Sequence, residues 1–433
     1  MKVFLDSIGC RLNQSEIESY AQQFRIAGHT LVGSAHQADL VVVNTCAVTQ
    51  AAAADSRQKI RQVARLRKDL AQETQISVTG CWSTLDPSGA AALPGVSMVI
   101  PNERKDKLVT EVLKLPQEFF EREFIERQPV PGLRFRTRAF IKVQDGCDNR
   151  CTFCITTLAR GRGRSRPIPA VLADIQVALA GGAQEVVLTG VHLGSWGLDF
   201  QPPSHLKQLV KVILSEINDC RVRLSSLEPW DLNHDFYELW QDKRLCRHLH
   251  LPLQSGCAAT LRRMARKTTP QSFQMLVSAA RQVIPGVAIT TDIIVGFPGE
   301  TDDEFKQSLE FVEEAQFTDG HVFTYSARPG TAAARMPGQV PPHLRKVRNA
   351  QMRQVCASSA KIFRQSFIGQ ELDVLWEAST TFGPQGWTVS GWTDNYLRVF
   401  STVSRELWNQ VTPVVLESDS AEGLFGRVHF SRA

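Results

Sequence analysis

The chain has 433 residues, of which 43% are hydrophobic and 21% are charged. This is the balance of a globular protein with two or three domains, and it excludes a mostly disordered chain. The net charge of +5 is compatible with a polyanionic partner without requiring one. The sequence has no run of 18 apolar residues and no secretory signal pattern, so we expect a cytoplasmic protein with no membrane segment.

Apolar strands that alternate with helices are predicted for the first hundred residues. Short apolar runs at residues 3–8, 39–44 and 75–79 are typical of strands, and residues 51–70 have helix composition. A chain that alternates in this way is expected to form a small parallel α/β domain.

Ten cysteines are present, and in a cytosolic chain we expect metal binding or catalysis rather than disulfides. Cys10, Cys46 and Cys81 each follow a predicted strand directly. Because the loops after parallel strands share one edge of a sheet, these thiols are expected to meet there. The alternative is three unrelated buried cysteines.

A stretch rich in acidic, aromatic and proline residues (115–134) is predicted to link the first domain (1–114) to a second one (135–366). Alternating strands and helices in the second domain predict an open or partial parallel barrel with its function on the loops after the strands. Its last helix between strands should start with a capping box at Thr301-Asp-Asp-Glu304. The six predicted strands are 140–143, 185–188, 222–225, 249–253, 289–295 and 321–325.

The last segment (367–433) has short strands separated by Gly, Pro and Asn turns. This pattern predicts a small antiparallel barrel of the kind that often binds oligonucleotides. Trp392, Tyr396 and Phe400 are expected to stack on bases or, in preference, to fill the barrel core. Acidic side chains accompany the basic ones, so a role in RNA binding depends on architecture more than on charge.

Three further cysteines share the loop that follows strand 140–143, in the string Cys147-Asp-Asn-Arg-Cys151-Thr-Phe-Cys154. Thiolates are the usual ligands of iron–sulfur clusters, and three of them leave one iron of a cubane cluster open. A structural zinc site would take four ligands, commonly as two pairs, and is the weaker alternative. The cysteines without partner spacing are predicted to be structural: Cys220, Cys246, Cys257 and Cys356.

This Cys-x3-Cys-x2-Cys spacing after a first barrel strand resembles the radical S-adenosylmethionine superfamily. The string Asp145 to Cys154, continued by Arg160-Gly-Arg-Gly-Arg-Ser-Arg-Pro167, resembles the methylthiotransferases in particular. The first domain is similar to the same family, and the terminal barrel resembles its TRAM domain. The similar strings are Gly9-Cys-Arg-Leu-Asn13, Asn44-Thr-Cys-Ala-Val-Thr49 and Thr79-Gly-Cys81.

Two strings are similar to the family branch that acts on threonylcarbamoyladenosine in tRNA: Thr189-Gly-Val-His-Leu-Gly-Ser-Trp-Gly197 and His250-Leu-Pro-Leu-Gln-Ser-Gly256. The resemblance implies an enzyme that adds a methylthio group to C2 of this nucleoside at position 37. Isopentenyladenosine in tRNA and a ribosomal protein are the alternative substrates. A non-enzymatic, redox-sensing iron–sulfur protein that binds RNA is the last alternative.

The resemblance also implies two 4Fe-4S clusters. The catalytic cysteines Cys147, Cys151 and Cys154 would hold the cluster that binds S-adenosylmethionine and cleaves it to a 5′-deoxyadenosyl radical. Cys10, Cys46 and Cys81 would hold the second cluster, which carries the sulfur that a second S-adenosylmethionine methylates. An electron donor and a sulfur source are further implied partners.

Residues at or just after the barrel strands are expected to shape the S-adenosylmethionine pocket. Glu228 would accept hydrogen bonds from ribose hydroxyls or the methionyl ammonium, or alternatively pair with an arginine. The strand within 291–299 resembles the superfamily's adenine-contacting strand, although its glycines can equally serve turns. The predicted cofactor-binding residues are Gly190, Glu228, Gln254, Asp292 and Gly296.

Arginines flank the loop cysteines and are the clearest polyanion signal. Guanidinium groups bind phosphates and stack on bases, so we expect them to contact the tRNA anticodon stem-loop. The alternative is a solvated edge, or pairing with Asp145 and Asp148. The predicted RNA-contacting residues are Arg160, Arg162, Arg164 and Arg166, preceded by Arg134, Arg136 and Arg138.

Overall fold

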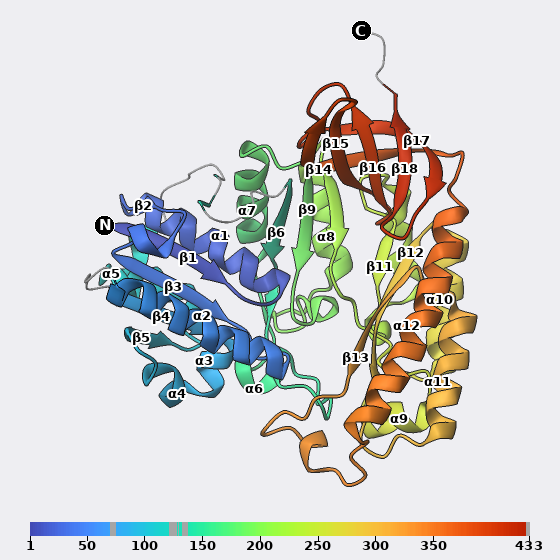
Figure 1. Cartoon of the computed structure of the whole chain (residues 1–433), viewed down its shortest axis with the longest axis horizontal. Coiled ribbons are helices and arrows are strands. Elements are labelled where there is room, and N and C mark those ends of the chain that lie inside the picture. Colours follow the sequence, from blue (N-terminus) through green and yellow to red (C-terminus); the bar gives the residue numbers. More distant parts are fainter. Residues whose placement is uncertain (70–74, 121–127, 129, 132–136, 430–433) are drawn as a thin grey trace. The chain divides into compact units, whose positions relative to one another are not determined.

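Two compact units make up the chain in the computed structural model (Figure 1). The first unit comprises residues 1–149, 154–181 and 189–191, and the second comprises 150–153, 182–188 and 192–433. Most of the predicted linker lies outside the described residues, which are 1–69, 75–120, 128, 130–131 and 137–429.

A parallel sheet forms the amino-terminal part of the first unit. Its strands are β1 (Lys2–Ser7), β2 (Thr30–Leu31), β3 (Leu40–Thr45), β4 (Gln75–Gly80) and β5 (Val96–Ile100), in the order β2-β1-β3-β4-β5. The helices here are α1 (Arg11–Ile26), α2 (Gln50–Asp69), α3 (Cys81–Leu85), α4 (Pro87–Ala91) and α5 (Leu108–Leu113). The predicted parallel α/β domain is confirmed, with β5 as an edge strand that the sequence patterns did not predict.

Both faces of this sheet are buried. Val42 of β3 belongs to the same core cluster as Phe24 of α1, whereas its neighbour Val43 belongs to a second cluster with Ile60 of α2. All six residues of β3 are buried as a result. Two-sided burial explains why this strand reads as a continuous apolar run rather than an alternating one.

The first unit continues with a short hairpin that brackets the cysteine loop. Its elements are β6 (Arg138–Lys142), β7 (Gln144–Asp145), α6 (Thr156–Arg160), β8 (Arg164–Ser165) and α7 (Ile168–Ala180). β7 and β8 are antiparallel, with Asp145 opposite Arg164. The beginning and end of the segment that holds the predicted iron ligands are therefore fixed to each other.

Parallel strands also run through the second unit: β9 (Glu185–Thr189), β10 (Arg221–Leu224), β11 (His248–His250), β12 (Ala288–Val295) and β13 (Asp319–Thr324). β9 pairs with β10, single parallel bridges lead from the β10 region to that of β11, and β12 pairs with both β11 and β13. The helices are α8 (Leu206–Glu216), α9 (Ala258–Arg263), α10 (Pro270–Val283), α11 (Asp302–Ala315) and α12 (Pro342–Gln365). With β6, all six predicted barrel strands are present.

The predicted capping box at the start of α11 is confirmed. The Glu304 amide donates to Thr301 Oγ1, and the Thr301 amide donates to the Glu304 carboxylate, each over 3.2 Å. Two amides that have no partner within the helix are thereby satisfied.

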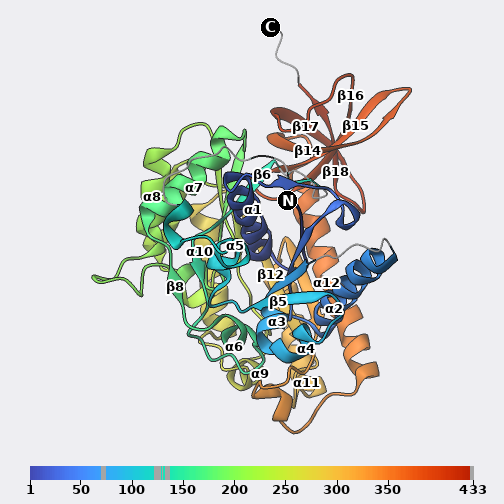
Figure 2. The ribbon, with the colours of Figure 1, turned by 90° about the vertical axis from the view of Figure 1, so that its left-hand side faces the viewer.

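A closed barrel ends the chain (Figure 2). Its strands are β14 (Glu371–Gly383), β15 (Gly386–Thr393), β16 (Arg398–Val403), β17 (Val411–Asp419) and β18 (Leu424–Val428), in the order β14-β15-β16-β18-β17. Phe400 is buried, but Tyr396 stacks between Trp392 and His248 at ring distances of 4.6 and 4.3 Å. The barrel prediction is confirmed, but Tyr396 packs against His248 of β11 and Trp392 stacks on Tyr396, and neither belongs to the barrel core cluster.

Arginines of the parallel strands attach the barrel. Arg223 binds the Glu185 carboxylate in a fork at 2.6 and 3.0 Å and donates to the carbonyl of Asp394 at 2.9 Å. Arg247 forms a second fork with the Asp394 carboxylate. In the described part of the chain, none of the helices combines the length and apolar composition needed to cross a membrane.

Candidate functional site

The amino-terminal cysteines lie at the ends of three adjacent parallel strands. Cys10 follows β1 at the start of α1, Cys46 follows β3 directly, and Cys81 begins α3 directly after β4. We call these residues the strand-end triad. Their common edge is what the strand-end rule predicts.

Close packing at Gly9 brings the first two loops of this triad together. Gly9 has φ +122°, and a Cβ there would lie 2.9 Å from Sγ of Cys46. Only glycine fits both the backbone conformation and the space. Any larger residue at position 9 would push the Cys10 loop away from Cys46.

Hydrogen-bond donors point at the sulfur of Cys81. Arg160 Nε lies 3.3 Å and Asn102 Nδ2 3.7 Å from Cys81 Sγ. Burial raises the pKa of Cys46 to about 11. Cys46 is therefore a neutral thiol at neutral pH, and a metal centre such as an iron–sulfur cluster would have to displace its proton.

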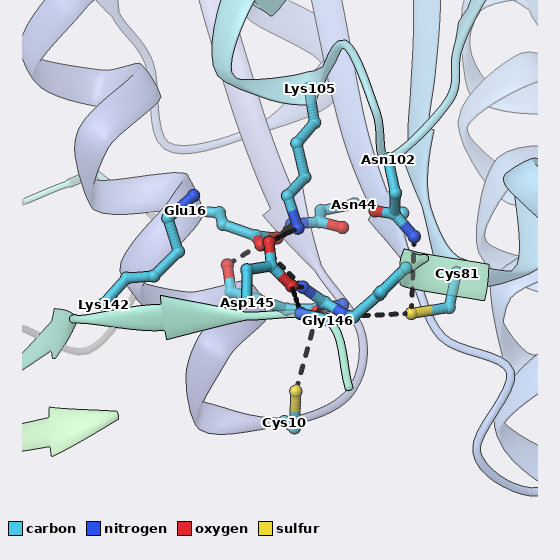
Figure 3. Close-up of polar contacts among 12 residues, drawn as sticks. Cys10, Glu16, Asn44, Cys81, Asn102, Lys105, Lys142, Asp145 and Gly146 are labelled. Carbon is cyan, nitrogen blue, oxygen red and sulfur yellow. Dashed lines mark hydrogen bonds and ion pairs between the residues drawn. The ribbon is translucent and has the colours of Figure 1, made fainter. Parts of the chain in front are cut away.

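A buried network of charged side chains lies beside Cys81 (Figure 3). Arg160 Nη1 lies 3.0 Å from carboxylate oxygens of both Glu16 and Asp145, and Lys105 pairs with the same two acids. Arg160 Nη2 also donates to Asn13 Oδ1 over 2.7 Å. Two cations and two acids thus neutralise one another in the interior.

The prediction that Arg160 contacts RNA is wrong. Arg160 is only 2% exposed, and it points its guanidinium at Glu16, Asp145, Asn13 and Cys81. The alternative of an arginine paired with Asp145 is confirmed. Arg160 stands beside exposed arginines in the sequence, so the sequence pattern did not indicate its structural role.

The charges of the network change the acidity of its carboxyl groups. Burial alone would raise the pKa of Glu16, but Arg160 and Lys105 outweigh it and lower that pKa to about 2. The same two cations lower the pKa of Asp145 against burial. Both acids are therefore ionised at neutral pH.

The second set of thiols, Cys147, Cys151 and Cys154, is the loop triad. In the first unit, the Asn149 amide lies 3.4 Å from Cys147 Sγ, and the Thr156 amide lies 3.4 Å from Cys154 Sγ. Gly146 has φ +72°, and a Cβ there would overlap the Arg162 carbonyl. Backbone amides, rather than distant side chains, face these two sulfurs.

Cys151 belongs to the second unit, where Arg266 is its neighbour. Arg266 Nη1 lies 3.7 Å from Cys151 Sγ, and its guanidinium forms a fork with the Glu228 carboxylate at 3.1 and 2.5 Å. The Trp230 ring lies under Arg266, 4.5 Å from centroid to guanidinium carbon. Glu228 therefore pairs with an arginine, which was the alternative to a direct role in binding S-adenosylmethionine. Its side chain is still 20% exposed.

The other predicted cofactor residues lie within or after the parallel strands. Gln254 has φ +71°, donates its amide to the Asp292 carbonyl and accepts from the Ile294 amide. A Cβ on Gly296 would overlap the Arg345 side chain, so close packing by itself explains the glycine at this position. Gly190 directly follows β9, and the Asp292 carboxylate lies between His250 and His321.

The remaining arginines differ in exposure. Arg162 is 92% exposed at 3.5 Å from Asp148, and Arg164 is exposed on β8. Arg166 is half-buried, paired with Asp174 and bonded to the Lys142 carbonyl. Arg138 is buried on β6, and Arg134 and Arg136 lie outside the described residues.

Several residues of the site were not predicted: Glu16, Asn102, Lys105 and Arg266. Glu16 had a visible signal, because it stands one helical turn before Tyr20 and so shares the buried side of α1. The other three are joined to their partners only by the tertiary fold, and no local pattern indicates them.

All ten cysteines lie within the described residues, where each is a free thiol. The strand-end triad therefore fits soft metal ligation, with three thiols at one sheet edge and N–H groups directed at the Cys81 sulfur. Cys220, Cys246, Cys257 and Cys356 are buried, as is usual for structural cysteines.

Comparisons with known proteins agree with these features. A family model described as "Uncharacterized protein family UPF0004" matches residues 2–100, and that of the Radical SAM superfamily matches residues 141–312. The chain is 33% identical to threonylcarbamoyladenosine tRNA methylthiotransferase MtaB of Bacillus subtilis, over 98% of this chain and 96% of the relative. The protein of that name from Thermotoga maritima is 36% identical over 92% and 90%.

A related branch and a solved structure complete the comparison. The tRNA-2-methylthio-N(6)-dimethylallyladenosine synthase of Desulfitobacterium hafniense is 30% identical over 100% of this chain and 98% of the relative. The radical S-adenosylmethionine methyltransferase TsrM from Kitasatospora setae shares the fold, with a TM-score of 0.58, 15% identity and 77% of each chain covered. The chain belongs to the radical S-adenosylmethionine methylthiotransferase family.

Proposed function

We propose that this enzyme adds a methylthio group to C2 of N6-threonylcarbamoyladenosine at position 37 of tRNA. The Bacillus subtilis and Thermotoga maritima relatives carry this nucleoside in their names. The observation that carries the proposal is the presence of two separate thiol triads. Sulfur insertion needs a site for the sulfur in addition to the site that activates S-adenosylmethionine.

Each triad would hold one 4Fe-4S cluster and leave one iron without a protein ligand. When bound, the two clusters and S-adenosylmethionine supply the radical that removes a hydrogen and the sulfur that replaces it. The protein supplies thiolates and directs N–H groups at their sulfurs, from Arg160 and Asn102 at Cys81 and from backbone amides at Cys147 and Cys154. Such hydrogen bonds favour the ionised sulfur and influence the reduction potential of a cluster.

We place S-adenosylmethionine against the loop triad, with Gly190, Glu228, Gln254, Asp292 and Gly296 as its contacts. Arg266 fixes the Glu228 carboxylate in a fork, and the exposed part of that carboxylate has lone pairs left for ribose hydroxyls or the methionyl ammonium. The Gln254 amide donates to the Asp292 carbonyl and the Gln254 carbonyl accepts from the Ile294 amide, so Gln254 is held beside β12, where we place the adenine.

For tRNA contact we retain Arg162 and Arg164, which are exposed, and the terminal barrel. Arg166 would need to leave Asp174 to reach a phosphate. A tRNA substrate supports the expected cytoplasmic location. An electron donor and a sulfur source complete the proposed reaction.

Isopentenyladenosine in tRNA is the second candidate substrate, because the Desulfitobacterium hafniense relative is named for that type of nucleoside and matches the whole chain. Anaerobic reconstitution followed by nucleoside mass analysis separates the two. Transcripts bearing either modified adenosine, and a ribosomal protein as a third arm, would be treated in parallel. We expect the methylthio product on threonylcarbamoyladenosine, and its absence there would contradict the proposal.

A second readout excludes a mere RNA-binding iron–sulfur protein. The enzyme should release 5′-deoxyadenosine from S-adenosylmethionine after reduction, and Cys151→Ala should not. A protein that binds tRNA but releases no 5′-deoxyadenosine would contradict the proposed chemistry.

A further inference from the structure

Two histidines and one aspartate, which belong to neither cysteine triad, meet on the parallel strands of the second unit. Asp292 on β12 and His321 on β13 are direct partners in the strand register. His250 at the end of β11 is paired with Thr290, two residues before Asp292, so its side chain shares their face of the sheet. The fold itself therefore brings these three side chains together.

The distances among the three suit a single metal ion. His250 Nε2 lies 3.2 Å from Asp292 Oδ2, His321 Nδ1 lies 3.3 Å from Asp292 Oδ1, and each residue offers a ligand atom within 4.8 Å of the others. In a tetrahedral site with metal–ligand bonds of about 2.0–2.1 Å, neighbouring ligand atoms are about 3.3 Å apart. Both histidine–aspartate distances are close to this value.

Thr290 orients the most buried of the three ligands. Its Oγ1 lies 2.9 Å from Nδ1 of His250 and 2.9 Å from Nε2 of His248. When Nδ1–H of His250 donates to this hydroxyl, Nε2 keeps its lone pair for a metal. The hydroxyl can then donate its own hydrogen to His248.

We propose that His250, Asp292 and His321 form a binding site for a divalent transition metal such as Zn²⁺ or Fe²⁺. Two imidazoles and one carboxylate suit these ions better than Mg²⁺ or Ca²⁺, which prefer oxygen ligands alone. Three protein ligands leave at least one position for water or an oxygen of another ligand. The His321 side chain is 60% exposed, which gives the ion a path from solvent.

Zinc titration of the enzyme with both clusters loaded tests this site without substrate, so its result does not depend on the methylthiolation activity. We expect one equivalent of zinc in the wild type and its loss in His321→Ala, while His343→Ala, a change of an exposed histidine on α12, keeps it. Asp292→Asn should weaken binding as well. No bound equivalent in the wild type, or equal binding in His321→Ala, would overturn the proposal.

X-ray absorption at the zinc edge distinguishes this site from cysteines left empty by cluster loss. The proposed site predicts only nitrogen and oxygen ligands at about 2.0–2.2 Å, whereas zinc on cysteines shows sulfur at about 2.3 Å. A sulfur shell would overturn the assignment even if the stoichiometry were one.

Discussion

The strand-end triad and the loop triad offer three thiols each, but the protein supports them by different means. The strand-end cysteines are far apart in sequence and come together because β1, β3 and β4 are neighbours in one sheet. Charged and amide side chains then reach their sulfurs, above all Arg160 and Asn102 at Cys81. Two loop cysteines, Cys147 and Cys154, instead receive backbone amides from residues two positions further along.

This difference shows where each site is vulnerable. A site built by side chains from distant elements depends on a few residues whose loss leaves a partner buried and unpaired. A site built by backbone amides depends on loop conformation, hence on glycines such as Gly146, and tolerates most side-chain changes. The comparison therefore predicts which substitutions damage one triad and spare the other.

Arg160→Leu should have the largest effect. It removes one of the two cations that pair with both Glu16 and Asp145, and breaking a buried ion pair costs about 3–5 kcal/mol of unfolding free energy. Anaerobic urea unfolding followed by circular dichroism measures this destabilisation. Arg162→Leu, at a fully solvated site, should change stability by less than about 0.5 kcal/mol, and an equal effect in both variants would contradict the account.

Acidification should weaken the strand-end region through Glu16. Its folded-state pKa of about 2 lies below the ordinary value of 4.5, so the stability it contributes is complete above pH 4.5 and is lost as the pH falls toward 2. The unfolding free energy of wild type and Glu16→Gln, followed over this range, should converge at low pH. Parallel pH profiles would show that the network does not hold Glu16 ionised.

Glu228→Gln tests the carboxylate that pairs with Arg266 beside Cys151. The change weakens the fork to Arg266, and hydrogen bonds between charged groups are worth about 1.5–3 kcal/mol, so we expect KM for S-adenosylmethionine to rise about tenfold or more. Iron content should stay unchanged, because Arg266, and not Glu228, is the side chain that reaches the Cys151 sulfur. Asp235→Asn, at the exposed pair with Lys207, serves as the control and should leave KM unaffected.

The double variant Arg162→Ala, Arg164→Ala should have the smallest effect on protein stability. It should lower only the affinity for tRNA. Removing two phosphate-binding arginines should reduce the slope of log affinity against log salt by about 1.4–1.8, or about 0.7–0.9 for each. Filter binding at several salt concentrations measures this slope. Arg166→Ala, at an arginine already paired with Asp174, should change it less, and the reverse order would assign the RNA contact to Arg166.

The sequence predicted most of the architecture because its strands carry local signals. β3 is an unbroken apolar run, the capping box at Thr301 is a four-residue pattern, and Cys10, Cys46 and Cys81 stand where strand ends were predicted. The short strand β5 at the sheet edge has a less continuous pattern and was missed. The last two barrel strands, β17 and β18, were also not predicted individually.

The site was less predictable where distant residues meet. Arg160 stands in a row of alternating arginines, and only the fold shows that it turns inward to Glu16 while Arg162 turns outward. Lys105 and Arg266 have no local pattern that links them to Asp145 or Glu228. The charge pattern of the sequence indicates a row of arginines, but it does not indicate which arginine of the row is buried.

The most direct test of two separate clusters is a paired measurement on Cys46→Ala and Cys151→Ala, with iron content and 5′-deoxyadenosine release determined on each reconstituted protein. Each variant should lose about four of about eight irons, because a cubane cluster holds four. Cys46→Ala should still release 5′-deoxyadenosine but form no methylthio product, whereas Cys151→Ala should lose both activities. Full iron content in either variant, or loss of 5′-deoxyadenosine release in Cys46→Ala, would contradict the division into two independently held sites.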